Sequence, residues 1–135
     1  MMSRPEDNEW KAFQGWAQGK LKLNRVENIL GDGMPDVIGT NCHGVGFWLE
    51  LKDLADWPVR DTTCPLHKKF RPGQLPFLLD WKSWGFNTYV LLRVKKIFYL
   101  VNPIDGLDKV TKEELPRYFI KVGIKDILEY LRELK

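Results

Sequence analysis

The sequence predicts an α/β domain in which helices flank a mixed β-sheet. Segments with apolar residues at helical spacing alternate with segments rich in β-branched and aromatic residues, and glycine and proline turns separate them. The chain of 135 residues suits a single domain with a sizeable core. We expect the core of this domain over about residues 6–102 and a helical C-terminal extension over about residues 111–135.

The N-terminal part is predicted to form one helix and three strands. Trp10, Phe13 and Ala17 recur at helical spacing, acidic residues fill the first turn, and Gly19 is expected to end the helix. Alternation predicts a strand in "KLKLNRVEN", which a turn with glycines and a proline follows. Two further β-rich segments joined by "TNCHG" predict a hairpin. The expected elements are the helix 5–18 and the strands 20–28, 36–39 and 44–52.

The remainder begins with a long loop over residues 53–73, a length that is typical of functional or disordered segments. A helix is expected over residues 74–84, with Pro76 tolerated because it lies in the first turn. Two strands over 86–94 and 96–103 follow, joined by a two-lysine turn. The tail is predicted to be helical in two pieces. Its apolar stripe consists of Ile124, Ile127, Leu128, Leu131 and Leu134.

Composition narrows the class of protein without deciding it. The net charge of +3 permits nucleic acid as a partner without requiring it. No apolar run is long enough to span a bilayer, and the polar N-terminus has no signal-peptide core, so an intracellular protein with no membrane partner is expected. We expect no small-molecule cofactor. Two cysteines in such a chain are usually free thiols.

Two acids and a lysine mark the end of the most apolar strand. Glu50 and Lys52 are two residues apart and therefore share one face of that strand, and a hairpin through "TNCHG" would bring Asp36 beside Glu50. Neighbouring carboxylates repel, and a hard divalent cation such as Mg²⁺ or Mn²⁺ relieves this repulsion. The backbone carbonyl of Leu51 could add a third oxygen ligand. The alternative is a simple salt bridge between Lys52 and one of the acids.

Glu-x-Lys alone is common, but its combination with a glycine turn, Pro-Asp, a short strand, a hairpin and an apolar strand is far rarer. "GMPDVIG" followed by "FWLELK" resembles the PD-(D/E)xK nuclease superfamily, and is most similar to its VRR-NUC type, which is found in phages and DNA-repair nucleases. "RPGQLPFLLDWKSWG" supplies the glutamine and glycine that flank the next helix in that family. The resemblance covers about residues 6–95. It implies a restriction-endonuclease-like core, also found in Holliday-junction resolvases.

The resemblance also implies a role for each matching residue. Asp36 and Glu50 would be metal ligands, Lys52 the catalytic lysine, and Gln74 would position the water or the scissile phosphate. The family's first helix commonly adds an acid near the metal. Glu9 is the first choice, Glu6 the second, and Glu27, near the turn, a third; the alternative is that each is a solvated acid in a helix turn.

Basic residues close to this pattern are the expected DNA contacts. The segment "LHKKFRPG" places four cationic or titratable side chains around Phe70, and the strand before the glycine turn adds an arginine. Nucleic-acid enzymes use cations to hold the phosphate backbone and carboxylates to hold the metal. The candidate DNA-binding residues are Arg25, His67, Lys68, Lys69 and Arg71.

The function that follows is hydrolysis of DNA phosphodiester bonds by a Mg²⁺- or Mn²⁺-dependent endonuclease, in a bacterial or phage-infected cell. Analogy with the family suggests branched DNA, such as a four-way junction, and a homodimer that supplies two active sites, in which the C-terminal helix could form the contact. The alternatives are a RecB-like exonuclease, a restriction-type endonuclease, and a non-catalytic DNA-binding module. A structural zinc site is a further alternative, with Cys42, His43, Cys64 and His67 as its ligands.

Overall fold

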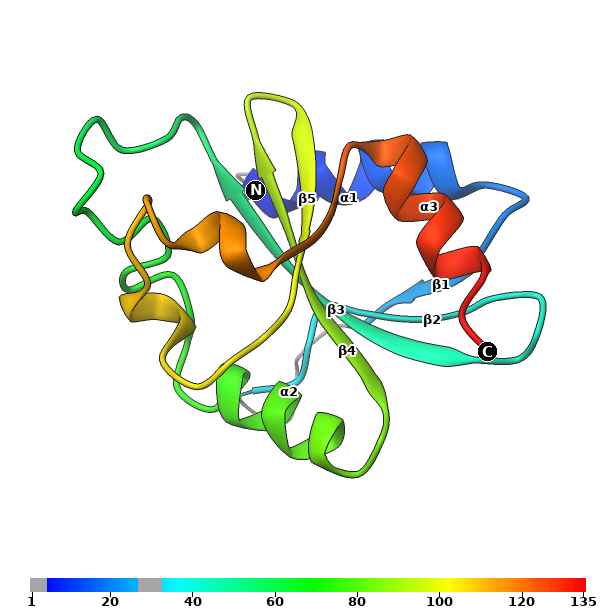
Figure 1. Cartoon of the computed structure of the whole chain (residues 1–135). Coiled ribbons are helices and arrows are strands. Elements are labelled where there is room, and N and C mark those ends of the chain that lie inside the picture. The colour runs from blue at the N-terminus through cyan, green and yellow to red at the C-terminus, as the bar shows by residue number, and fades with distance from the viewer. Residues whose placement is uncertain (1–4, 27–32) are drawn as a thin grey trace.

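The computed structural model describes residues 5–26 and 33–135, which form one six-stranded sheet with helices on both faces (Figure 1). None of the helices in this described part is long and apolar enough to cross a membrane. The helices are α1 (Pro5–Ala17), α2 (Gln74–Ser83) and α3 (Ile124–Arg132), with 3-10 turns at η1 (Leu107–Lys109) and η2 (Leu115–Tyr118). The strands are β1 (Lys22–Arg25), β2 (Val37–Thr40), β3 (Gly46–Leu54), β4 (Asn87–Val94), β5 (Ile97–Val101) and β6 (Phe119–Val122).

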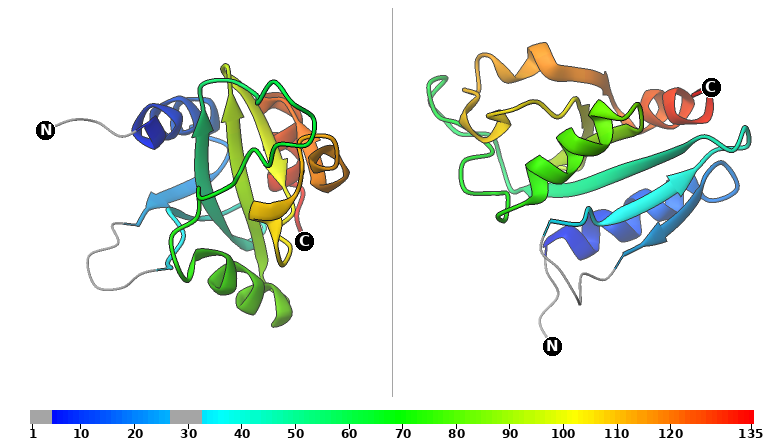
Figure 2. Two further views of the ribbon diagram at one scale, coloured as in Figure 1. Left: turned by 90° about the vertical axis from the view of Figure 1, so that its left-hand side faces the viewer. Right: turned by 90° about the horizontal axis from the view of Figure 1, so that it is seen from below.

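The strands follow one another across the sheet in chain order. All neighbours pair antiparallel except β3 and β4, which pair in parallel. A parallel pair needs a crossover, and the segment that contains α2 supplies it. The sheet is therefore mixed, as the sequence predicted. Figure 2 shows that α1 and α2 lie on opposite sides of the sheet.

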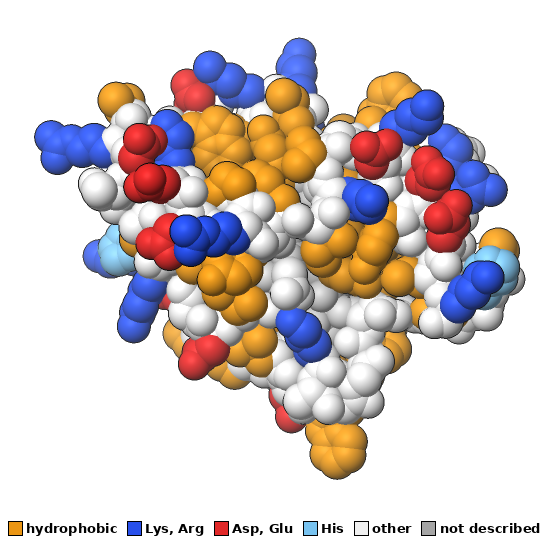
Figure 3. All heavy atoms as spheres, in the orientation of Figure 1, with side chains coloured by type: hydrophobic (Ala, Val, Ile, Leu, Met, Phe, Trp, Pro, Cys, Tyr) orange, Lys and Arg blue, Asp and Glu red, His pale blue; other side chains and the backbone are white. Residues whose placement is uncertain are grey.

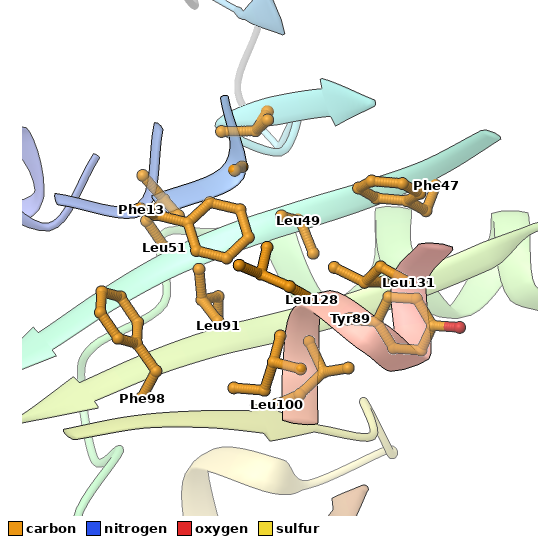
Figure 4. Close-up of a cluster of buried hydrophobic side chains, with 13 residues drawn as sticks. Phe13, Phe47, Leu49, Leu51, Tyr89, Leu91, Phe98, Leu100, Leu128 and Leu131 are labelled. Atoms are coloured by element: carbon orange, nitrogen blue, oxygen red, sulfur yellow. The ribbon is translucent and has the colours of Figure 1, made fainter. Parts of the chain in front are cut away.

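Each face of the sheet carries its own core. On one face α1 and α3 cover the side chains of β3 to β5, and Phe13, Leu51 and Leu128 meet between them (Figure 4). On the other face α2 and the two 3-10 turns cover a second cluster that includes Trp48 and Leu78. Burial of apolar surface on both faces explains why β3 is apolar from Gly46 to Leu49 and β4 from Tyr89 to Leu92.

The C-terminal segment differs from the sequence prediction. Instead of two helical pieces, it contains a 3-10 turn, strand β6 and helix α3, so the sheet gains a sixth strand. β6 has only four residues and lies at the edge of the sheet, which leaves too short an alternating pattern to detect. The apolar stripe of α3 packs on its own sheet, with Ile127 and Leu131 fully buried. This stripe therefore belongs mainly to the core of its own chain, and its end residues Ile124 and Leu134 stay partly exposed.

The long loop between β3 and α2 is held against the segment before β6 (Figure 1). The carbonyl of Thr63 accepts a hydrogen bond from the Lys112 N–H at 2.8 Å, and Leu66 is fully buried. These contacts explain how a loop without regular structure reaches the start of α2 along a defined path. Pro76 lies in the first turn of α2, as expected.

Candidate active site

The hairpin of β2 and β3 brings Asp36 and Glu50 together. Val37 pairs with Leu49, so Asp36 lies just beyond the end of β2, beside Glu50. The Leu51 N–H donates a hydrogen bond to Asp36 Oδ2 at 2.8 Å. The N–H and the carbonyl of one strand residue lie on the same side of the strand, so the Leu51 carbonyl also faces the Asp36 side. Both carboxylates and this carbonyl thus lie at one point of the sheet.

Lys52 links this point to the start of α2. Its Nζ lies 3.0 Å from Glu50 Oε2 and donates a hydrogen bond to Gln74 Oε1 at 3.2 Å. The ammonium group also lies 4.9 Å from the centre of the Phe70 ring. The Arg71 N–H donates to the same Gln74 oxygen at 2.8 Å, which holds the glutamine side chain in place. Acid, lysine and glutamine therefore form one buried chain of polar contacts.

Glycines allow the turn before Asp36 to touch the start of α2. Gly33 has φ of 100°, a backbone conformation that residues other than glycine rarely adopt. A Cβ atom at Gly33 would lie 2.8 Å from the carbonyl oxygen of Gly73, the residue before α2. The close contact of these two backbones brings Asp36 and Gln74 to the same cavity. The glycine turn of the sequence pattern thus has a steric reason.

Burial makes the charge on Glu50 unfavourable. Its side chain is 1% exposed, and although Lys52 lies beside it, neither carboxylate oxygen has a partner with hydrogen-bonding geometry among the described residues. Burial first, and then the charge of Asp36, raise the pKa of Glu50 to about 8, while Lys52 lowers it. A buried carboxylate that lacks hydrogen bonds and lies beside a second carboxylate suits a divalent cation. The residues present therefore fit such an ion.

These side chains open into a cavity of about 320 Å³. Lys69 and Arg71 line it, so the basic segment before α2 does reach the acidic site. His67 and Lys68 are exposed and do not line the cavity. In Figure 3 the edge of the molecule where the loop between β3 and α2 lies carries lysine and arginine side chains with acidic side chains among them. The lining residues are Glu6, Asp36, Glu50, Lys52, Lys69, Arg71 and Gln74.

The acids of α1 divide between two places. Glu6, the second choice from the sequence, lines the cavity. Glu9, the first choice, is fully buried on the α1 side of β3, and within residues 5–26 and 33–135 neither of its carboxylate oxygens has a hydrogen-bond partner. Burial first, and then the charge of Asp53, raise the pKa of Glu9 well above its ordinary value, while Arg93 lowers it. Glu27 lies outside the described residues.

Arg25 forms an ion pair on the surface beside α1. Its Nη2 lies 2.6 Å from Asp7 Oδ1, and both side chains are about a quarter exposed or less. The ion pair ties β1 to the first turn of α1, from which Glu6 reaches the cavity. Arg25 does not itself line the cavity.

The zinc alternative finds no support in residues 5–26 and 33–135. Within these ranges no three His, Cys, Asp or Glu side chains are grouped so that they could hold a metal ion. Cys42 is exposed at the β2–β3 turn, whereas Cys64 Sγ contacts the Lys109 carbonyl at 3.2 Å. The two carboxylates of the cavity would therefore need backbone, water or substrate oxygens to complete a coordination sphere.

Sequence reasoning missed two contributors to the site. Phe70 lies beneath the ammonium group of Lys52, although the sequence shows it only as one aromatic residue in a basic loop. The Asp53–Arg93 ion pair, at 3.0 Å between Oδ2 and Nη2, lies across β3 and β4 and accounts for part of the electrostatic environment of Glu9. The parallel pairing of Asp53 with Arg93 would have revealed it, but that register follows from the crossover and not from the local sequence.

Comparison with known proteins bears out the fold. No protein-family model matches the chain, and no curated protein matches it by sequence. Among solved structures it is similar to a Holliday junction resolvase of the archaeal hyperthermophile Archaeoglobus fulgidus, with a TM-score of 0.59 at 14% sequence identity. The match covers 90% of this chain and 98% of the resolvase. The chain has the fold of that resolvase. At this level of identity the likeness shows the fold alone.

Proposed function

We propose that this protein is a divalent-metal-dependent DNA endonuclease that hydrolyses phosphodiester bonds in branched DNA. The observation that carries the proposal is the convergence of Asp36, Glu50, Lys52 and Gln74 on one cavity. Two carboxylates, an ammonium group and an amide suit hydrolysis of a phosphodiester, because this reaction builds up negative charge on oxygen. The resolvase fold supports the same function, and membership of the VRR-NUC type stays a prediction from the motif.

Asp36, Glu50 and the Leu51 carbonyl are the groups that would hold Mg²⁺ or Mn²⁺. The carboxylate of Glu6 also lines the cavity, but Glu6, Asp36 and Glu50 are not grouped closely enough in the described chain to hold one ion together. The remaining ligands would be backbone, water or substrate oxygens. When bound, such an ion lowers the pKa of a water molecule and offsets charge on the phosphate. The chain itself supplies a cavity in which both carboxylates are held by strand geometry.

Lys52 and Gln74 would act on the phosphate and the attacking water. The Lys52 ammonium is held between Glu50 and Gln74, so its charge is fixed at the cavity wall and can stabilise the negative transition state. Gln74 Oε1 already accepts two hydrogen bonds, which leaves its amide N–H groups as donors. Lys69 and Arg71 would hold the phosphates that flank the cleavage position. His67 and Lys68 would contact phosphates further along the DNA strand.

The branched substrate is proposed by analogy with the resolvase, whose name states its substrate. A four-way junction has two symmetric cleavage positions, so we also propose a homodimer. Its interface would not be the apolar stripe of α3, because Ile127 and Leu131 are buried in the core of their own chain. Light scattering at assay concentration tests this part separately from cleavage.

Purified protein tested on a panel of end-labelled substrates, with Mg²⁺ or with EDTA, tests the proposal. With Mg²⁺ but not with EDTA, we expect discrete fragments from a four-way junction or a flap. A linear duplex of the same sequence should be cleaved more slowly. Release of mononucleotides would favour an exonuclease, and sequence-specific cuts in linear duplex a restriction-type enzyme. Binding without cleavage in Mg²⁺ and in Mn²⁺ would contradict the proposal and favour a non-catalytic module.

A further inference from the structure

A second basic surface lies outside the cavity, on the C-terminal half of α1 and on β1. Residues 10–26 contain four lysine or arginine residues and no acid. Arg25 is engaged by Asp7, but Lys11 and Lys22 form no ion pair with any side chain of the described chain. Both line a hollow of about 480 Å³ between α1 and β1, together with Gln14, Gln18 and neighbouring backbone. We call the side chains of Lys11, Gln14, Gln18 and Lys22 the α1–β1 surface.

A glycine within α1 gives an independent reason to expect a close partner here. Gly15 is exposed in the last turn of α1 and lines the same hollow, and a Cβ atom built on it would meet nothing within 4 Å. Glycine weakens a helix interior relative to alanine, and no packing contact of the described residues requires it at this position. A glycine on an exposed helix surface does, however, let the backbone of a partner come close to the helix.

The helix connects this surface to the cavity. Glu6 lines the cavity near the start of α1, and Gly15 follows nine residues later. At 1.5 Å per residue this separation is about 14 Å along the helix axis. Successive phosphates of one strand are about 3.4 Å apart along a duplex, so the separation corresponds to about four nucleotides. Figure 2 shows α1 and β1 together at one side of the molecule.

We propose that the α1–β1 surface binds the DNA phosphate backbone about four nucleotides from the cleavage position. Lys11 and Lys22 supply charge, Gln14 and Gln18 supply amide donors, and no acid between residues 10 and 26 repels the phosphates. Gly15 lets the sugar–phosphate backbone approach the helix. The inference rests on the proposed nuclease function for its choice of ligand. It adds a contact that holds the substrate without taking part in hydrolysis.

Fluorescence anisotropy of a labelled four-way junction and a linear duplex, in EDTA and over a series of salt concentrations, tests this contact. For K11Q/K22Q we expect at least a tenfold loss of affinity at low salt and a salt slope shallower by about 1.8, because two phosphate contacts are lost. The matched control K121Q/K125Q removes the same charge from exposed positions on β6 and α3 and should bind within twofold of wild type. Equal loss in both double variants would overturn the proposal, as would no loss in either.

Gly15→Gln provides a second variant that changes no charge. Glutamine is the better helix former, so the thermal unfolding midpoint should rise while DNA affinity falls several-fold. Unchanged affinity in this variant would contradict the close approach at Gly15. If wild type cleaves DNA and K11Q/K22Q binds it with full affinity, the proposed surface is refuted and the nuclease function is not. If K11Q/K22Q binds DNA more weakly but wild type does not cleave it, the nuclease function is refuted and the surface is not.

Discussion

Replacing Glu50 by glutamine is expected to abolish DNA cleavage and, at the same time, to stabilise the metal-free protein above neutral pH. Loss of one carboxylate from the cavity should lower the cleavage rate by about a thousandfold or more, since the ligands of a catalytic ion contribute several kcal/mol to the transition state. A variant that simply folds poorly would lose both cleavage and stability. A loss of cleavage together with a gain in stability therefore separates a catalytic role of Glu50 from a structural one.

The stability effect follows from the raised pKa of Glu50. The folded protein holds the proton up to about pH 8, whereas the unfolded chain releases it near pH 4.5. Between these values the native state binds more protons, so the free energy of unfolding falls as pH rises, by about 1.4 kcal/mol per unit at most. Glu50→Gln should remove the part of this fall that Glu50 causes, whereas the buried Glu9, whose pKa is also raised, should still contribute a fall of its own.

Urea unfolding at pH 5 and pH 8 without divalent ions, together with single-turnover cleavage in Mg²⁺, measures both effects. Glu113→Gln, which changes an exposed acid far from the cavity, is the matched control and should leave both measurements near wild type. A Glu50→Gln protein that cleaves at the wild-type rate would contradict the assignment of the site. An unchanged pH dependence of stability would contradict the raised pKa of the buried Glu50 carboxyl.

Asn41→Ala is expected to cause the largest loss of stability among single polar substitutions. Asn41 is buried at the β2–β3 turn, and its side chain forms hydrogen bonds to carbonyl groups at the C-terminal end of α3. Its Nδ2 donates to the carbonyls of Leu131 and Leu134 at 3.0 and 2.8 Å. Its Oδ1 accepts hydrogen bonds from two N–H groups of the turn. Alanine would leave the buried Leu131 carbonyl and three partly buried groups without this partner, at a cost of about 3 kcal/mol.

Chemical denaturation measures this loss directly. The neighbouring exposed residue provides a control, because Cys42→Ser should change the free energy of unfolding by no more than about 0.5 kcal/mol. DNA cleavage by folded Asn41→Ala protein should stay close to wild type, since Asn41 does not line the cavity that holds Asp36 and Glu50. A loss below about 1 kcal/mol would mean that water replaces the side chain at these carbonyls.

The convergence of the acidic residues could be predicted because it depends on local geometry. Alternation along β3 places Glu50 and Lys52 on one face, and a short hairpin fixes Asp36 opposite Glu50. Gln74 was predicted from the family pattern, and its placement at the cavity depends on the contact between Gly33 and Gly73. That contact joins segments 40 residues apart, which no local pattern reveals.

Features that depend on tertiary packing escaped prediction. Glu6 and Glu9 are three residues apart on α1, and only the rotation of the helix against the sheet decides that Glu6 lines the cavity and Glu9 is buried. Strand β6 forms because β5 offers an unpaired edge, and not because its four residues show a strong pattern. Asn41 reads as an ordinary turn residue, although its partners lie about 90 residues further along the chain.

The central claim is that the carboxylates of Asp36 and Glu50 together form a binding site for a divalent ion. Electron paramagnetic resonance of free Mn²⁺ during titration with protein tests it without any substrate. We expect that wild type removes about one equivalent of Mn²⁺ from solution and that Asp36→Asn, folded to the same extent by circular dichroism, removes far less at the same concentrations. Equal binding of Mn²⁺ by the two proteins would contradict it.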